Sequence, residues 1–507
     1  MSPEGTDSVI EQWWRPDRRT PLAATLMLAG AMLIAYVPIV IGNLPDGWPV
    51  IIGFFVGGLV VLGVAYVIEV MRVRRTSLAV DDERVRYRFE FVMRKHASVP
   101  RERVRTVEIT ADPAQRLLGI ATLKLGSGEK DGQITLRALD RELAERLRAR
   151  LLDRSVVAGV STDATADAVE PGVGELARWH PSWLRYAPLS LWTFVLAGAA
   201  FGVPLQVAQW FNAEPEVWER LTTPVRGNGL IAGIAIIAGI ALVIGVAASI
   251  ALHAEAWWGF RLERASDGTL HIQRGLIVSR STTFEGNRIR GAVLVEPLGA
   301  RVAGGARIEL IALGLGKKKD DQQRAESSTV MPEAPRAEVL PVLAAITGEG
   351  LPTLAAHPRA ARSKRLRWAA VGTVALTLGA AVLVATTGVG WWLIPLVAVM
   401  ASGSLIWLAS ASYAALGHAF TDRHVVIRYG ALRRATHAVR REAVVSWNVT
   451  QSVFQRRLGL ATAAATTAAD LSLVPAPDMG VGQVNGVLAE SDQRLWGPLI
   501  AVPSSGR

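Results

Sequence analysis

Long stretches without a charged residue alternate with polar segments along the chain. Six of these apolar stretches fall into three pairs, and each is long enough to cross a bilayer core at about 1.5 Å of helix rise per residue. The stretches are residues 22–42 and 48–68, residues 187–211 and 229–252, and residues 368–387 and 391–413. The pattern therefore predicts a polytopic α-helical membrane protein with six transmembrane helices arranged as three hairpins.

The polar segment after each pair shows a different periodicity. Apolar and polar residues alternate in Val85–Phe89, His271–Arg274 and Val425–Tyr429, which is typical of half-buried strands. In the first segment, strands are predicted near residues 78–80, 84–92, 96–99, 104–110, 120–126 and 133–137. Leu139–Leu152 follows as an amphipathic helix, because its leucines recur every four residues with charges between them. We therefore predict small β-rich domains, each closed by a C-terminal helix.

A short motif identifies the three polar segments as copies of one unit. Its skeleton is Arg-x-x-Gly-x-Ala, and its residues are Arg116, Gly119 and Ala121, then Arg301, Gly304 and Ala306, then Arg456, Gly459 and Ala461. The glycines are 185 and 155 residues apart, and the alternating hairpins keep the same distance from them. Glycine permits a turn that a side chain would forbid, and the alanine suits a tight contact. The arginine is expected to reach a carboxylate or a main-chain carbonyl, so a structural role is favoured over a binding role.

These patterns divide the chain into alternating membrane and soluble parts. The expected order is an N-terminal segment 1–21, transmembrane hairpin 22–71, first β domain 72–155, linker 156–186, hairpin 187–252, second domain 253–349, basic linker 350–367, hairpin 368–413, third domain 414–490 and tail 491–507. The second domain carries a basic insertion at residues 317–336. The third loses the pattern beyond Ala461 and keeps only a weak closing helix near residues 484–490.

The charge distribution predicts the orientation. Half of the residues are apolar, 20% are charged and the net charge is +11. Arginines cluster at the ends of the apolar stretches, as expected on the cytoplasmic side of a membrane. This placement favours a cell-membrane protein with all three domains and both termini in the cytoplasm, and it disfavours nucleic-acid binding. An uncleaved anchor is favoured over a signal peptide because a second apolar stretch follows the first at once.

Residues suited to catalysis or metal binding form no motif. The chain has no cysteine and its eight histidines are scattered, so neither a thiolate site nor a His-Glu-x-x-His zinc site is expected. Gly314–Lys317 lacks the first glycine and the hydroxyl of a phosphate-binding loop. The apolar stretches hold almost no charge, which disfavours proton-coupled transport. We therefore expect no enzymatic activity, no cofactor and no metal.

Two pairs of segments resemble a known family. They are Val99–Val104 with Arg116–Leu123 in the first copy, and Val439–Val444 with Arg456–Ala461 in the third. Together with the paired apolar stretches, they resemble the bacterial membrane-flanked PH-like domain proteins, in particular the YdbT-like members with three such domains. The resemblance covers nearly the whole chain. It implies a PH-like fold for each unit, with strongly bent or paired antiparallel sheets capped by one C-terminal helix.

Two functions are compatible with this pattern. The first is a non-enzymatic scaffold or envelope-stress component that presents three PH-like domains at the cytoplasmic face. Its expected partners are membrane lipids and another membrane-flanked PH-like protein or a second copy of itself. Candidate contacts to anionic lipid are Arg72, Arg74, Arg75, Arg101, Arg103, Arg105, Lys317, Lys318 and Lys319. The alternative is a lipid or small-molecule transport component in which the six helices form a conduit.

Overall fold

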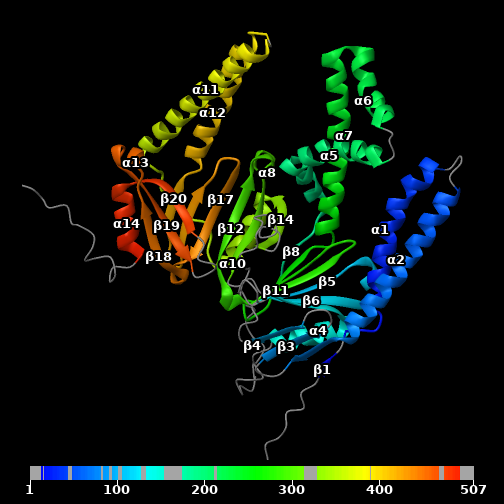
Figure 1. The fold of residues 1–507 in the computed structure, drawn as a ribbon. Coiled ribbons are helices and arrows are strands. Elements are labelled where there is room, and N and C mark those ends of the chain that lie inside the picture. The colour runs from blue at the N-terminus through cyan, green and yellow to red at the C-terminus, as the bar shows by residue number, and fades with distance from the viewer. Residues whose placement is uncertain are drawn as a thin grey trace, which may run out of the picture. The chain divides into compact units, whose positions relative to one another are not determined.

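The computed structural model contains two compact units that divide between Arg288 and Ile289, inside the second repeat copy. It describes residues 13–14, 16–43, 48–80, 84–90, 94–100, 106–126, 133–152, 174–210, 214–312, 328–388, 390–467 and 473–491. Figure 1 shows long helices in pairs and several antiparallel sheets. Each unit is described by itself below.

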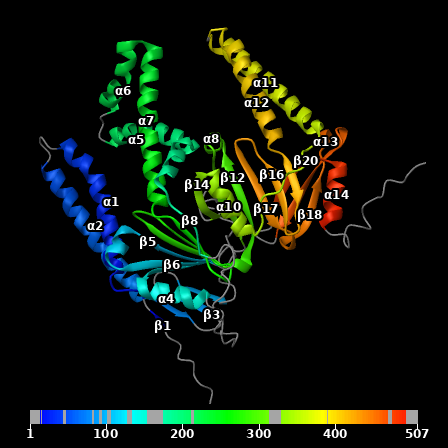
Figure 2. The same ribbon diagram turned by 180° about the vertical axis from the view of Figure 1, so that it is seen from behind.

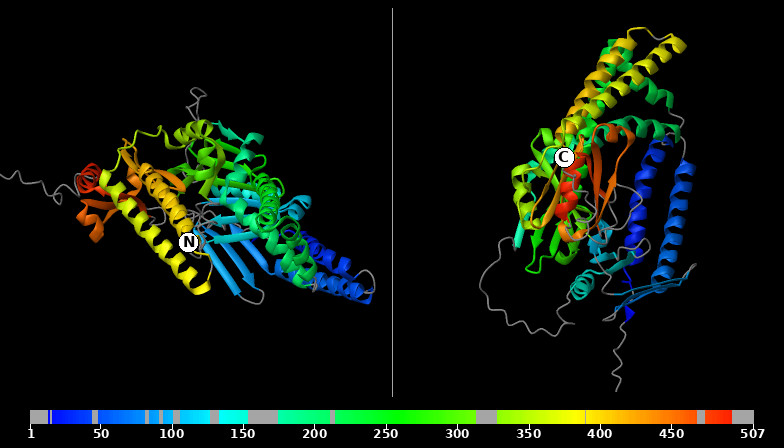
Figure 3. Two further views of the ribbon diagram at one scale, coloured as in Figure 1. Left: turned by 90° about the horizontal axis from the view of Figure 1, so that it is seen from above. Right: turned by 90° about the vertical axis from the view of Figure 1, so that its left-hand side faces the viewer.

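Helices occupy all six apolar stretches. They are α1 (Thr20–Asn43), α2 (Trp48–Arg74), α5 (Leu191–Trp210), α7 (Leu230–Trp257), α11 (Arg359–Thr387) and α12 (Leu393–Ala414). Helices α1 and α2 run side by side, as the blue pair in Figure 3 shows, and so do α11 and α12. A further helix, α6 (Glu214–Asn228), and a 3-10 helix at Pro181–Leu189 flank α5. The sequence pattern did not indicate either of them.

Four helices, rather than the six expected, are long and apolar enough to cross a membrane within the described residues. They comprise Ile51–Arg74, Leu230–Trp257, Arg359–Thr387 and Leu393–Ala414. Within the described residues, helices α1 and α5 contribute the shorter apolar segments Thr20–Leu33 and Leu191–Ala200. The chain is thus built around several membrane-compatible helices, and the expectation of six spans is met by four.

The first unit holds two antiparallel sheets. One has the order β1-β2-β3-β4, formed by β1 (Trp13–Trp14), β2 (Thr76–Val80), β3 (Arg84–Glu90) and β4 (Arg94–Pro100). The other has seven strands in the order β7-β6-β5-β11-β10-β9-β8. Its members are β5 (Thr106–Ala111), β6 (Ile120–Gly126), β7 (Gln133–Asp140), β8 (Gly174–Arg178), β9 (Arg261–Arg264), β10 (Leu270–Arg274) and β11 (Ser279–Phe284). This sheet combines strands from the first and second repeat copies.

The second unit repeats this arrangement. A six-stranded sheet has the order β14-β13-β12-β17-β16-β15, and Figure 2 shows β12, β17 and β16 in it. Its members are β12 (Ile289–Pro297), β13 (Gly305–Ala312), β14 (Thr329–Pro335), β15 (Gly417–Phe420), β16 (His424–Tyr429) and β17 (Arg433–Arg440). A three-stranded sheet follows, with β18 (Val444–Thr450), β19 (Leu460–Thr467) and β20 (Leu473–Gly480). Strand β14 lies in the segment expected as an insertion.

Successive copies are joined by strand pairing in one shared register. Strand β5 of the first copy pairs with β11 of the second, and β12 of the second pairs with β17 of the third. The register can be counted from the repeat glycine of each copy. In both junctions, the residue 11 positions before the glycine of the earlier copy lies opposite the residue 22 positions before the glycine of the later copy. Glu108 is thus opposite Thr282, and Val293 is opposite His437. The two junctions are therefore equivalent, residue for residue.

A closing helix follows the last strand of every copy. These helices are α4 (Arg141–Leu152), α10 (Arg336–Thr347) and α14 (Val481–Ser491). The third copy is more complete than its sequence suggested, because alanines of β19 are buried with two valines of α14: Ala461, Ala463, Ala465, Val484 and Val487. Alanine gives little hydrophobic periodicity, yet its small side chain lets a helix pack closely on a strand. The Ala- and Thr-rich segment is therefore core strand.

Replacing Gly304 by alanine tests the structural role of the repeat glycine. Its φ is +74° and a Cβ would meet no atom within 4 Å, so only backbone strain opposes the change. We expect Gly304→Ala to lower the free energy of unfolding by about 1 to 2 kcal/mol, and Gly304→Asn to cost less. Thermal unfolding of the full-length protein in detergent measures this. Gly379→Ala, which also has no atom within 4 Å and lies in helix α11, is the control; an equal loss there would contradict the strain account.

Candidate functional site

The repeat glycines end three short helices in the same way. Each follows α3 (Pro113–Leu117), α8 (Leu298–Val302) or α13 (Val453–Arg457) in a left-handed conformation, with φ of +70°, +74° and +64°. Each glycine carbonyl accepts a hydrogen bond from the first residue of the closing helix, at 3.0 Å from Arg141, 2.9 Å from Arg336 and 3.1 Å from Val481. The motif alanines Ala121, Ala306 and Ala461 are buried. The motif thus links the short helix, the sheet and the closing helix.

The short helices also contact the next copy. Arg116 donates hydrogen bonds through Nη1 to the carbonyls of Leu276 at 2.5 Å and Ile277 at 3.4 Å, in the hairpin turn of the second copy. In the second unit, the main-chain N–H of Leu298 donates to the carbonyl of Leu432 at 2.7 Å, in the hairpin turn of the third. Arg116 thus reaches a main-chain carbonyl, one of the two partners expected for the motif arginine. The motif therefore lies at the junction between copies.

The residues beside the repeat glycine also support the base of a long helix. In the first copy, Ala23 of α1 packs with Ala114, Leu118 and Ile120. In the third, Ala361 of α11 packs with Leu416, Leu458 and Leu460, the last two being the equivalents of Leu118 and Ile120. Because an alanine makes the contact on each helix, the helix base approaches the module closely. The residues around the motif glycine therefore hold the bases of α1 and α11 against their β modules.

The second unit contains a half-open groove of about 690 Å³ at the junction of the second and third copies. One wall is apolar and comes from α10, with Leu340, Pro341 and Ala344. The linker residues 350–354 form the opposite side, and the floor comes from β12, β16 and β17. The paired edge of the two copies is therefore the floor of a concave site.

The polar residues of the groove are arranged around Glu296, whose side chain is buried. Arg434, directly opposite on β17, donates to both carboxylate oxygens at 2.8 and 2.7 Å. Arg336 Nε lies 3.4 Å from the same carboxylate. Burial lowers the pKa of Arg428, and the nearby positive charges of Arg434 and Arg336 add to this effect. Burial likewise lowers the pKa of the motif residue Arg301, with Arg434 contributing. The guanidinium groups outnumber the carboxylate, so an anion would complete the charge balance.

The groove is tied to the end of a membrane-compatible helix. Arg428 Nε donates to the carbonyl of Ala415 at 3.1 Å, and Ala415 is the C-cap residue of α12. Positive charge is favourable at a helix C-terminus, where carbonyl groups are unpaired. The groove therefore combines an apolar wall, surplus guanidinium charge and a position beside a helix end, an arrangement suited to an amphipathic anion.

The charged cluster is specific to the second junction. The equivalents of Glu296, Arg434 and Arg428 in the first junction are Ala111, Ser279 and Gln273, at the same distances from the repeat glycines. Sequence reasoning did not identify this groove. The available signal was the presence of Arg428 and Arg434 in the hairpin of β16 and β17, but only the pairing with β12 brings them to Glu296.

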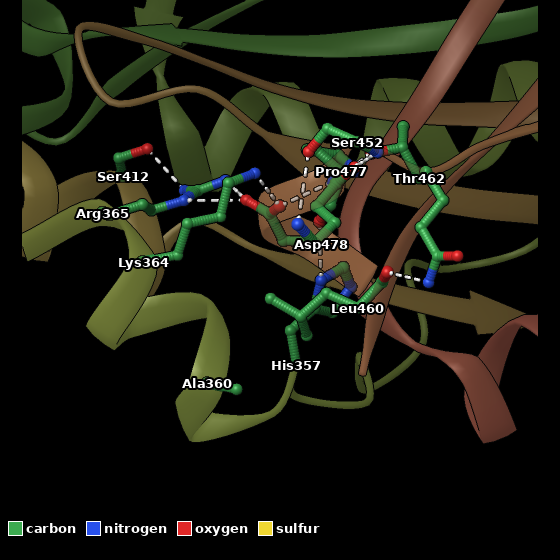
Figure 4. A network of polar contacts seen from close by, with 12 residues as sticks. His357, Ala360, Lys364, Arg365, Ser412, Ser452, Leu460, Thr462, Pro477 and Asp478 are labelled. Carbon is green, nitrogen blue, oxygen red and sulfur yellow. Dashed lines mark hydrogen bonds and ion pairs between the residues drawn. The ribbon is translucent and has the colours of Figure 1, made fainter. Parts of the chain in front are cut away.

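A second polar network fixes α11 to the third module. Asp478 of β20 accepts hydrogen bonds from Lys364 Nζ at 2.5 Å and Arg365 Nη2 at 3.0 Å, and Figure 4 shows both side chains directed at it. Gln455 Nε2 donates to the same carboxylate at 2.9 Å. Burial acts to raise the pKa of Asp478, but the hydrogen bonds from Lys364 and Gln455 outweigh it and the pKa is lowered. Asp478 has a φ of +59°, and no other non-glycine residue in the described ranges has a positive φ. The network holds it there.

Two histidines of the second unit are neutral at physiological pH. Burial, followed by the charge of His418, lowers the pKa of His357 to about 4. Burial and Arg433 lower the pKa of His437 to about 4. His357 Nδ1 lies 3.0 Å from the carbonyl of Pro477, beside the Asp478 network. Across the described ranges, no group of three or more histidine and carboxylate side chains is placed to hold a metal ion.

The predicted lipid-contact residues fall into two groups. Arg72 lies 3.6 Å from Glu69 in α2, and Arg74 and Arg75 at the end of that helix are exposed. Arg101, Arg103, Arg105, Lys317, Lys318 and Lys319 lie outside the described residues. Of the remaining motif residues, Arg456 is exposed at the end of α13. The arginines of the groove are thus additional to the predicted set.

Asp478→Asn tests the network at the base of α11. Asparagine tolerates the left-handed backbone but leaves Lys364 and Arg365 partly buried without a negative partner. We expect a loss of about 2 to 3 kcal/mol in the free energy of unfolding, below the cost of about 3 to 5 kcal/mol for a fully buried ion pair, because both cations are partly exposed. Chemical denaturation of the full-length protein in detergent measures it. Glu442→Gln removes an exposed pair with Arg440 and should cost less than about 1 kcal/mol; similar losses for both variants would argue against an anchoring role.

A comparison with known families identifies two regions of the chain. The model of the bacterial PH domain matches residues 27–155 and residues 370–493. The first range runs from α1 through α4, and the second from α11 through α14. No curated protein and no solved structure matches the chain. The protein is therefore a PH-like domain protein whose first and third repeat copies match the bacterial PH domain.

Proposed function

We propose that the protein is a non-enzymatic membrane scaffold of the membrane-flanked, YdbT-like type, with three PH-like copies. The second copy is included because its motif glycine, strand order and junction register match those of the other two. In this proposal all six apolar helices span the cell membrane and the three modules lie at the cytoplasmic face. The exposed Arg74 and Arg75 at the end of α2 fit such an orientation.

The observation that carries the scaffold proposal is the strand pairing between successive copies. A flexible linker would let each PH-like module move independently, whereas a continuous sheet fixes neighbouring strands through a ladder of main-chain hydrogen bonds. The packing of α1 and α11 beside the repeat glycines connects the first and third modules to their apolar hairpins. Such a molecule can hold several binding surfaces close to the membrane.

The ligand that we propose for the groove is the headgroup of an anionic phospholipid. Arg336 and Arg428 offer donors for a phosphate, and the wall of Leu340, Pro341 and Ala344 offers an apolar surface for the start of an acyl chain. The link from Arg428 to the end of α12 supports a position near the membrane interface. A fully soluble anion would make no use of the apolar wall.

Lipid retention by the full-length protein tests this proposal. Native mass spectrometry in detergent should show more bound phosphatidylglycerol than phosphatidylcholine when both lipids are supplied equally. Arg336→Gln should weaken phosphatidylglycerol binding about tenfold, because one charge-assisted hydrogen bond contributes about 1.4 kcal/mol. The matched control is Arg146→Gln, which removes an exposed arginine of α4 that pairs with Glu142. Equal retention of both lipids, or equal effects of the two substitutions, would contradict the proposed ligand.

A further inference from the structure

In the third copy, strand β18 has an outer edge that no described strand covers. In the sheet order β18-β19-β20, strand β18 is terminal, so one of its edges has no partner among the described strands. Strands β5 and β12 hold the equivalent place in the first and second copies. There, the same edge carries the hairpin of the next copy. The edge of β18 is thus equivalent to the two edges that β11 and β17 cover in the other copies.

The side chains of β18 reflect the missing neighbour. Ten positions before the repeat glycine, Ile109 is 9% exposed and Leu294 is 1% exposed, but the equivalent Val449 is 44% exposed. Val445 and Val453, on either side of it along the chain, are 63% exposed. Val453 is the equivalent of Leu298, which donates to the hairpin turn of the next copy in the second unit. The apolar position of Val449, which is covered at the other two junctions, is therefore uncovered here.

A complementary edge exists in the first copy. Strand β4 is terminal in the order β1-β2-β3-β4, so one of its edges is also unpaired within the described strands. Its equivalents are β11 and β17, which use that edge to pair with β5 and β12. Among the described strands, one edge of each kind is therefore unoccupied. An unpaired strand edge is a template for pairing with another chain.

We infer that β18 of one molecule pairs antiparallel with β4 of a second copy of this chain. The shared register places Asn448, 11 positions before its repeat glycine, opposite Ala97, 22 positions before its own. It likewise places Val449, 10 positions before its glycine, opposite His96, 23 positions before its own. A second copy is the fitting occupant, since the chain already builds this junction twice with strands of the same kind. The inference rests on the proposed scaffold function and names a partner for it.

This contact is heterologous, because different surfaces of the two molecules meet. Each added molecule covers β18 of its neighbour and leaves its own β18 open. Association therefore extends head to tail until a ring closes or a filament ends. Main-chain hydrogen bonds supply the pairing, and the exposed Val449 and Val453 supply apolar area that becomes buried.

Disulfide cross-linking tests the contact and its register, because the natural chain has no cysteine. Four full-length single variants are used: Asn448→Cys and Val449→Cys in chains with one affinity tag, and Ala97→Cys and His96→Cys in chains with another. Each pair is co-expressed in membranes and oxidised. The matched pairs 448/97 and 449/96 should give a dimer carrying both tags. The crossed pairs 448/96 and 449/97 place the thiols on opposite faces of the ladder and should link at least about tenfold less.

The outcomes distinguish this inference from its alternatives. Absence of a two-tag dimer from both matched pairs, or equal yields from matched and crossed pairs, would overturn it. A chain carrying both Asn448→Cys and Ala97→Cys that links only within itself would show the molecule closing on itself, which also excludes the second copy. Phosphatidylglycerol retention by the same variants separates the two proposals: retained lipid without a dimer removes only the present inference. Val449→Lys in the 448/97 pair should lower the yield by placing a charge on the edge.

Discussion

The arrangement of this protein depends on the main-chain hydrogen bonds between strands of successive repeat copies. A strand edge carries N–H and C=O groups that must find partners when they are removed from water. Here β11 satisfies the edge of β5, and β17 satisfies the edge of β12, in one common register. A PH-like copy in this chain is therefore not an independent domain joined to the next copy by a linker alone. The first and third copies each share one sheet with the second copy, and every described strand of the second copy lies in a shared sheet.

Because the two junctions share one register, the residues at equivalent positions can be compared directly. In the first, the cross-strand pair is Ala111 and Ser279; in the second, it is Glu296 and Arg434. A buried carboxylate requires a paired cation, and Arg434 provides it with two hydrogen bonds. The additional arginines around this pair leave a surplus of positive charge in an apolar groove. The second junction thus carries a charged groove on a strand pairing that both junctions share.

Much of the fold could be predicted from the sequence, because it is recorded in local periodicity. The alternation in Val425–Tyr429 lies in strand β16, and the leucine stripe predicted over Leu139–Leu152 forms helix α4 from Arg141 on, while Leu139 itself lies in strand β7. The strand β19 was missed because alanine carries little periodic signal. Pairing between copies could not be predicted, since no local pattern specifies which distant edge a strand will join. The groove was missed for the same reason: Glu296 and Arg434 are 138 residues apart.

Site-resolved amide hydrogen exchange tests the joining of copies most directly. The measurement uses the full-length protein in membranes, diluted until it is monomeric, and compares β5 and β12 with their equivalent β18. The account predicts that amides on the outer edges of β5 and β12 are protected like those of central strands, while those of β18 exchange much faster. Equally fast exchange in all three strands would show that the copies are not joined by strand pairing.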